Sequence, residues 1–215
     1  MPNALLTLGS NVNPEGYLPA AIEMLQQGIA RGGSVRVSYL RAFAPDGAAA
    51  AGQSPDFVNG AVLLDVEATP RALREHLHRL EAALGRVRGR ILRRIDIDLA
   101  WIEDPRVQQT AAPRAARVND DASQRRALGS SESTGHSSGT SDQLVLPQPG
   151  LDRLAYLVLP AADLMPDWVH PSAGRTLAEL ARTAMTQTPS RRLYDLETRV
   201  AQLAGVTVCG SDGRG

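Results

Sequence analysis

Residues 69–102, "TPRALREHLHRLEAALGRVRGRILRRIDIDLAWI", hold the clearest helix signal of the chain and the strand that follows it. Thr69 can cap the first helical turn through its hydroxyl, and Pro70 suits the first helical position because it has no N–H to lose there. Leucines then recur every three or four residues, as on the buried face of an amphipathic helix: Leu73, Leu77, Leu80 and Leu84. The pattern predicts a helix with one face on a core, and then a strand over residues 94–102.

The residues before this stretch alternate between further strands and one more helix. "ALLTLGSN" (4–11) is typical of a short strand that stops at a turn, and residues 17–29 have the apolar spacing of an amphipathic helix. "SVRVSYLRAF" (34–43) alternates as a half-buried strand does, and "FVNGAVLLDVE" (57–67) is again strand-like. The order strand–helix–strand–strand–helix–strand predicts an α+β, ferredoxin-like (split βαβ) fold, with helices packed on a mainly antiparallel sheet.

The second half of the chain begins with a change of composition. Residues 104–143 contain almost no large apolar side chain, so they cannot bury enough surface to order themselves. Apolar patterning returns at "LVLPQPGLDRLAYLVLPAADLMPDWVHP" (144–171). We therefore expect one domain over residues 1–182, interrupted by a disordered insertion at 104–143. Residues 183–215 are expected to form a flexible or partly helical C-terminal tail.

Composition and charge limit the kinds of partner. The formal net charge is zero and no run of about 18 apolar residues occurs, so neither a nucleic acid nor a membrane is an expected partner. The start of the sequence has no basic segment followed by a long apolar one, which favours a cytoplasmic location. Cys209 is the only cysteine, which excludes an intrachain disulfide and a multi-cysteine metal site. We expect a monomer.

Asp96 and Asp98 interrupt the apolar residues of the last strand. Side chains two apart in a strand share a face, so both carboxylates point the same way while Ile95, Ile97 and Leu99 point toward the helices. Two carboxylates roughly 6 to 7 Å apart repel each other unless a divalent cation lies near them. Their oxygens suit Mg²⁺, which takes further ligands from water and phosphate. A solvent-facing strand with two ordinary acidic residues is the other interpretation, and the spacing alone does not decide.

Five arginines precede the two aspartates within about ten residues: Arg86, Arg88, Arg90, Arg93 and Arg94. Guanidinium groups match phosphate oxygens, so arginines beside two carboxylates indicate a metal-bound polyphosphate. The alternative is that these arginines are merely solvated at a helix end and loop. The sequence has neither a G-x-x-x-x-G-K-[ST] motif nor a kinase-type glycine-rich loop, which argues against those two enzyme classes.

Several motifs, taken together and in this order, resemble one family. They are "LTLGSN", "SPDFVNGAVLLD", "LEAALGRVR", "RRIDIDLAWI", "LPQPG" and "YLVLPAADLMPDW". The chain is similar over residues 4–103 and 144–182 to the 6-hydroxymethyl-7,8-dihydropterin pyrophosphokinase (HPPK) family. The resemblance implies transfer of pyrophosphate from ATP to 6-hydroxymethyl-7,8-dihydropterin, giving the pterin diphosphate and AMP in folate biosynthesis. It also implies two Mg²⁺ ions, with ATP as co-substrate.

The resemblance also assigns roles to individual residues. Asp96 and Asp98 match the metal ligands, and Glu81 matches a position that we expect to be structural. The catalytic residues it implies are Arg86, Arg88 and Arg93; the pterin-binding residues are Phe57, Asn59 and Tyr156; and the ATP-binding residues are Arg86, Arg88, Arg93, Gln148 and Arg153. For the two aromatic residues, a place in the core is the alternative to stacking on the pterin ring.

The match fails at several points on the ATP side. Only "GRIL" (89–92) separates Arg88 from Arg93, so the loop expected to close over ATP is about three residues short and lacks its aromatic residue. Gln148 stands where the family has a phosphate-contacting histidine, and a neutral amide cannot carry charge. The family's arginine two residues before the stacking aromatic falls at Leu154, while Arg153 lies one place earlier.

These departures leave three hypotheses open. The first is an active pyrophosphokinase with a reduced lid. The second is a divergent paralogue that acts on a related pterin, or acts with altered efficiency. The third is a non-catalytic module that binds either a pterin or nucleotide, or RNA. For RNA binding, the sequence offers few aromatic residues and no recognisable motif.

Overall fold

The computed structural model describes residues 3–30, 33–44, 55–87, 92–103 and 144–210. Arg88 and the predicted insertion at 104–143 lie outside the described residues.

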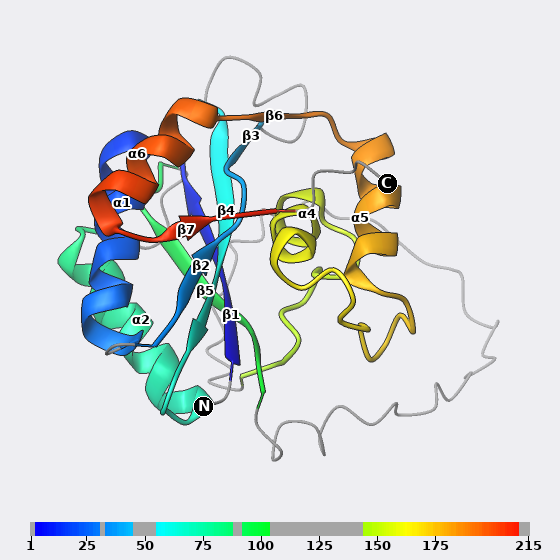
Figure 1. The fold of residues 1–215 in the computed structure, drawn as a ribbon, viewed down its shortest axis with the longest axis horizontal. Helices are drawn as coiled ribbons and strands as arrows, with labels where there is room; N and C mark the ends of the chain where they lie inside the picture. The colour runs from blue at the N-terminus through cyan, green and yellow to red at the C-terminus, as the bar shows by residue number, and fades with distance from the viewer. Residues whose placement is uncertain (1–2, 31–32, 45–54, 88–91, 104–143, 211–215) are drawn as a thin grey trace, which may run out of the picture.

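A mainly antiparallel sheet forms the centre of the molecule (Figure 1). Its strands are β1 (Asn3–Ser10), β2 (Val35–Val37), β3 (Arg41–Phe43), β4 (Phe57–Asp65), β5 (Asp96–Ile102), β6 (Ser190–Arg192) and β7 (Thr207–Val208). The order is β5-β1-β4-β2-β7, with β3 pairing with β4 and β6 with β3. All neighbouring pairs are antiparallel except β2 and β7.

The connections make this sheet a split βαβ fold, so the predicted fold class is confirmed. Helix α1 (Pro14–Leu25), extended by the π-helical turn η1 (Gln26–Ala30), joins β1 to β2, which lie on either side of β4. Helix α2 (Pro70–Ala83) joins β4 to β5, which lie on either side of β1. Each helix therefore crosses over one intervening strand.

Helix α2 forms where the local signals place it. The hydroxyl of Thr69 accepts a hydrogen bond from Ala72 N at 3.2 Å, and Pro70 occupies the first turn. Its buried face carries the predicted leucines Leu73, Leu77 and Leu80. The cap and the apolar spacing together fix both the start of the helix and the face that it buries.

The prediction of a single strand over residues 34–43 is wrong, because the structure has two strands there, β2 and β3. Between them, the hydroxyl of Ser38 accepts from Ala61 N at 2.8 Å and donates to Tyr39 O at 2.9 Å. Leu40 N donates to the Glu197 carboxylate at 3.0 Å. Side chains thus satisfy backbone groups that a continuous strand would pair with its neighbour.

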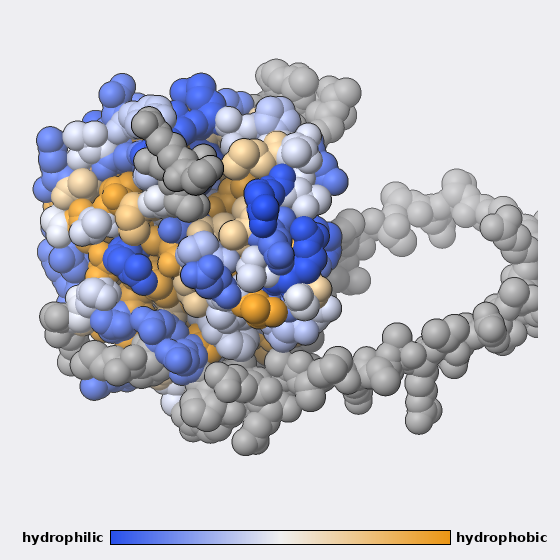
Figure 2. Space-filling model, turned by 45° about the vertical axis from the view of Figure 1, so that its right-hand side comes forward, coloured by the Kyte–Doolittle hydropathy of each residue, from blue (hydrophilic) through white to orange (hydrophobic). Residues whose placement is uncertain are grey.

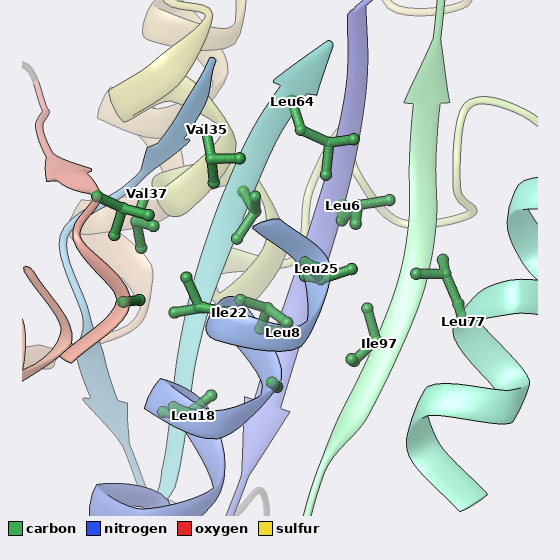
Figure 3. Close-up of a cluster of buried hydrophobic side chains, with 14 of the residues drawn as sticks. Leu6, Leu8, Leu18, Ile22, Leu25, Val35, Val37, Leu64, Leu77 and Ile97 are labelled. Carbon is green, nitrogen blue, oxygen red and sulfur yellow. The ribbon is translucent and has the colours of Figure 1, made fainter. Parts of the chain in front are cut away.

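Helices cover both faces of the sheet. In Figure 1, α1, α2 and α6 (Tyr194–Ala204) lie on one side, and α4 (Ala155–Leu164) and α5 (Leu177–Gln187) on the other. Each face has its own buried cluster. Figure 3 shows part of the cluster under α1 and α2, where Leu18, Ile22 and Leu25 of α1 meet Leu6 and Leu8 of β1.

The C-terminal residues are packed into this fold. Strand β6 pairs with β3, α6 lies beside α1, and β7 pairs with β2 at the sheet edge. Leu196 and Val200 of α6 belong to the same buried cluster as α1. The part of the predicted tail that the structure describes is therefore partly helical, and it covers strands that would otherwise form an edge.

The face of the molecule shown in Figure 2 carries both hydrophobic and hydrophilic residues. Figure 2 shows hydrophobic residues gathered over the left half of one face, with hydrophilic residues between and around them. None of the helices in the described ranges combines the length and the apolar character that crossing a bilayer requires.

Candidate active site

A row of directly paired residues runs across the sheet from β5 to β6. Asp96 pairs with Gly9, Gly9 with Asn59, Asn59 with Arg41, and Arg41 with Arg192. Directly opposed side chains of antiparallel strands share a face. We call these five residues the cross-sheet row. Gly9, Asn59 and Asp96 line one pocket together with residues of α4, and Arg41 forms an ion pair with Asp163 of that helix.

A pocket of about 460 Å³ opens above this row, between the sheet, α4 and the loop that precedes α4. It brings together most of the residues predicted for the site: Phe57, Asn59, Arg93, Asp96, Asp98, Gln148 and Tyr156. The carboxylates lie on β5, and the aromatic residues come from β4 and α4. One cavity therefore has an acidic and basic end and an aromatic end.

Two arginines hold the Asp96 carboxylate. Arg93 pairs with its Oδ2, and Arg86 Nη2 lies 2.7 Å from its Oδ1. This Oδ1 is buried and lacks a partner with hydrogen-bond geometry. The Asp96 carboxylate thus lies between two positive charges.

Asp98 has a different environment, at the mouth of the pocket. Gln148 Nε2 donates to its Oδ2 at 3.3 Å. Loss of surrounding water raises the pKa of Asp98 above its usual value, and the nearby Asp96 charge raises it further, against smaller opposing effects of arginines. A cation beside the two carboxylates would relieve both effects.

Glu81, expected to be structural, links α2 to both β5 and Arg86. Its buried carboxylate accepts from Ile97 N at 2.7 Å and from Arg86 Nη1. Burial raises the pKa of Glu81, although these hydrogen bonds and the Arg86 charge act in the opposite direction. Glu81 therefore places Arg86 beside Asp96.

The turn after β1 positions the other arginine. Asn11 Oδ1 accepts from Arg93 N at 2.6 Å, and Asn11 N donates to Arg93 O at 3.0 Å. Gly9 leaves room in the pocket floor, because a Cβ there would lie 3.0 Å from Asn59 Oδ1. Gly9 and Asn11 of the Gly-Ser-Asn motif thus shape the pocket floor and hold the Arg93 backbone.

Gln148, predicted to contact ATP, is held by Thr7, a residue that no sequence motif singled out. Thr7 Oγ1 donates to Gln148 Oε1 at 2.9 Å, which turns Gln148 Nε2 toward Asp98. Thr7 pairs directly with Asp98 across β1 and β5. Strand register places Thr7 beside Asp98, and a backbone hydrogen bond from Gln148 N to Ala100 O at 2.9 Å holds Gln148 nearby, so no local sequence signal could have identified Thr7.

Phe43 is the second residue that was missed, at the aromatic end. Its ring meets Tyr156 edge-on, with 6.4 Å between ring centroids and 77° between planes. Phe43 also pairs directly with Phe57 across β3 and β4. It therefore supports both aromatic side chains predicted to stack on a ring.

The remaining predicted residues lie apart from the pocket lining or outside the described residues. Arg86 reaches the site only through Asp96. Arg153 is 69% exposed at its side chain and pairs with Asp152, while Leu154 lines the pocket instead. Arg88 lies outside the described residues.

The two carboxylates suit Mg²⁺, which needs few protein ligands, better than a metal ion that is held by protein side chains alone. Within the described ranges, no three or more His, Cys, Asp or Glu side chains gather closely enough to hold an ion. Mg²⁺ in phosphate-transfer sites commonly takes one or two carboxylates, with water and phosphate oxygens as further ligands. Asp96 and Asp98, side by side on one strand face, supply that minimum.

The fold and the pocket define an α+β protein with a ligand site between an antiparallel sheet and a covering helix. The profile of the 7,8-dihydro-6-hydroxymethylpterin-pyrophosphokinase (HPPK) family matches residues 5–166, and the chain belongs to this family.

One curated relative is the 2-amino-4-hydroxy-6-hydroxymethyldihydropteridine pyrophosphokinase of Synechocystis sp. It is 26% identical over 142 residues, which cover 65% of this chain and 53% of the relative. The chain thus spans about half the length of the curated relative that it matches.

Proposed function

We propose that the protein transfers pyrophosphate from ATP to 6-hydroxymethyl-7,8-dihydropterin, giving the pterin diphosphate and AMP for folate biosynthesis. The observation that carries this proposal is the single pocket that joins an aromatic and amide end to a carboxylate and arginine end. Membership of the HPPK family and the name of the Synechocystis relative support the same reaction.

The aromatic end suits a flat heterocycle with polar edges. Phe57 and Tyr156 lie on different elements of the pocket wall, so a ring could stack between them. Asn59 lines the pocket floor between them and the carboxylates, and its amide can both donate and accept hydrogen bonds. We assign pterin binding to these three residues.

The acidic and basic end suits a metal-bound triphosphate. We assign two Mg²⁺ ions to Asp96 and Asp98, and the phosphate oxygens to Arg86, Arg88 and Arg93. When bound, Mg²⁺ would neutralise charge on the phosphates and orient them for in-line attack. Gln148 and Arg153 stay predictions as ATP contacts, and Gln148 also holds Asp98 in place.

The reaction needs positioning more than covalent help from the protein. A bond forms between the hydroxymethyl oxygen and the β-phosphorus, and the bond from that phosphorus to the α,β-bridging oxygen breaks. The bonding electrons leave with AMP, and the hydroxyl proton passes to solvent. Arginine side chains would stabilise the charge that develops on the leaving phosphate.

The test is a reaction of the protein with ATP, Mg²⁺ and 6-hydroxymethyl-7,8-dihydropterin, followed by separation of the products. We expect AMP and the pterin diphosphate in equal amounts, with no AMP when the pterin is omitted. ADP as the product, or release of AMP without pterin, would contradict the proposal. Size-exclusion chromatography tests the predicted monomer. The predicted cytoplasmic location, without nucleic-acid or membrane partners, rests on sequence alone.

A further inference from the structure

The pocket has a wall residue that lies beyond the family match. The match ends at residue 166, yet Thr188, which follows α5, lines the pocket together with Phe43 and Ala44. Thr188 is half-buried, whereas Thr186, two residues earlier, is exposed. The chain therefore builds part of this wall from residues outside the matched region.

Strand pairing places Thr188 at the aromatic end of the pocket. Ser190 pairs directly with Phe43, and Phe43 with Phe57. Thr188 comes two residues before Ser190, so it continues β6 on the side where Ala44 continues β3. The carboxylates lie on β5, with β1 and β4 between β5 and β3, roughly 14 Å away at one strand spacing per step.

A charged clamp holds β6 against β3. Arg192 makes a bidentate ion pair with Glu197, at 2.9 to 3.0 Å, and its guanidinium lies over the rings of Tyr39 and Tyr194. The Glu197 carboxylate also accepts from Leu40 N at 3.0 Å. This buried carboxylate thus ties α6 to β6 and to the backbone just before β3.

Phe43 connects the clamp to Phe57 and Tyr156, the two residues proposed to bind the ring. Ser190 fixes Phe43 from one side, and Phe43 contacts Tyr156 edge-on and pairs with Phe57 on the other side. Arg41, also on β3, forms a nearly buried ion pair with Asp163 of α4, the helix that carries Tyr156. Both aromatic walls are therefore connected to the C-terminal segment.

We propose that residues 188–208 form a specificity element of the pterin pocket, in which Thr188 contacts the ring system and the Arg192–Glu197 clamp positions Phe43. This inference rests on the proposed function, because it assigns the pterin to that end of the pocket. Thr188 is a specificity-determining residue, while Arg192, Glu197 and Phe43 are positioning residues.

The first test changes Thr188 and measures binding rather than turnover. Thr188→Val removes the hydroxyl at nearly constant volume, and Thr188→Phe fills part of the pocket. We expect the Kd for 6-hydroxymethyl-7,8-dihydropterin to rise about 3- to 10-fold for Thr188→Val, as for one lost hydrogen bond. It should rise more for Thr188→Phe, while the Kd for a nonhydrolysable ATP analogue with Mg²⁺ stays unchanged. Thr186→Val and Thr186→Phe are the matched controls, and both should bind like the wild type.

The second test changes the clamp. Glu197→Gln keeps an oxygen for Leu40 N but removes the charge that holds Arg192. We expect a raised pterin Kd with an unchanged nucleotide Kd, measured well below the unfolding temperature by calorimetric titration. Glu15→Gln removes an exposed partner of α6, since Arg199 lies 3.7 Å from Glu15, and it should change neither constant.

The proposed function and the specificity element would be contradicted by different results. If the wild-type protein does not bind the pterin, the proposed function fails. If it binds the pterin, but both Thr188 variants and Glu197→Gln match the wild type in pterin Kd, only the specificity element is overturned. A proportional rise in both the pterin and the nucleotide Kd would also overturn it, because that result indicates a general structural role.

Discussion

Asp96 and Asp98 are neighbours on β5, but the protein compensates their charges differently. Two guanidinium groups form ion pairs with Asp96, whereas Asp98 accepts a hydrogen bond from the neutral amide of Gln148. The pKa of Asp98 is raised by loss of solvent and then by the Asp96 charge. The charge of Asp98 is therefore less compensated than that of Asp96, and a bound cation would stabilise the Asp98 carboxylate more.

Asp98→Asn should abolish most of the turnover while leaving the fold intact. The variant keeps a partner for Gln148 but loses the carboxylate that we propose as a Mg²⁺ ligand, and metal-ion catalysis is worth several kcal/mol of transition-state stabilisation. We expect kcat/KM for AMP formation to fall on the order of 10²- to 10³-fold, with an unchanged or slightly higher Tm. Asp195→Asn, at an exposed position in the first turn of α6, is the control. Normal turnover of Asp98→Asn would remove the carboxylate pair from the mechanism.

Glu81→Gln should lower stability, because it removes the charge that faces Arg86 inside the protein. The amide can still accept from Ile97 N, so we expect the free energy of unfolding in urea to fall by about 1 to 3 kcal/mol. Glu75→Gln on the same helix breaks only the exposed pair with Arg71 and should cost less than about 0.5 kcal/mol. Equal losses in the two variants would show that the buried carboxylate has no special role.

At the scale of elements, His170 organises the connection between α4 and α5. Its Nδ1 accepts from Ala173 N at 3.3 Å, and its ring meets Trp168 edge-on at 5.7 Å. His170 therefore caps the turn after it and packs against the indole ring. Burial lowers the pKa of His170, with a smaller opposing effect of Asp152, so the neutral ring is favoured in the folded protein.

This shift predicts a loss of stability as the pH falls. A histidine with a lowered pKa in the folded state binds its proton more readily when unfolded, so its stabilisation is present above the unfolded pKa of about 6.5 and is lost below it. We expect the free energy of unfolding, measured in urea, to decrease between pH 7.5 and 5.5, by at most about 1.4 kcal/mol per pH unit from this residue. His170→Gln should flatten that part of the profile, while carboxyls with raised pKa act in the opposite direction in both proteins. Parallel profiles would contradict the prediction.

Elements with local signals were predictable, and elements held by distant partners were not. The start of α2 follows from Thr69 and Pro70, whose effects act within one turn. The break between β2 and β3 depends on Glu197, 157 residues away from Leu40. Strands β6 and β7 are two or three residues long, too short for an alternating pattern to stand out.

At the scale of the whole molecule, the C-terminal helix α6 is part of the core. Leu196→Ala should lower the free energy of unfolding by about 2 to 5 kcal/mol, because the side chain is buried in the cluster under α1. Leu203→Ala on the same helix removes a side chain that is 56% exposed and should change stability by less than about 0.5 kcal/mol. If Leu196→Ala were equally neutral, α6 would not contribute to the cooperative fold.

The candidate site was predictable to the extent that its residues lie in sequence motifs. Asp96 and Asp98 share a face because they are two apart in a strand, which is a local property. The hydrogen bond between Thr7 and Gln148 joins residues 141 apart, and the ion pair between Arg41 and Asp163 joins residues 122 apart. Such contacts depend on register and helix placement, which no motif specifies.

The cross-sheet row has a consequence for which substrates could ever react. Asp96 and Asn59 are two strands apart, with Gly9 between them, so about 10 Å of hydrogen-bonded backbone separates the proposed place for the phosphates from the proposed place for the ring. No exchange of one side chain alters that length, since slipping a strand by one residue would turn its side chains to the opposite face. Evolution toward bulkier or smaller acceptors would therefore have to proceed through the surrounding helices and loops, with the sheet unchanged.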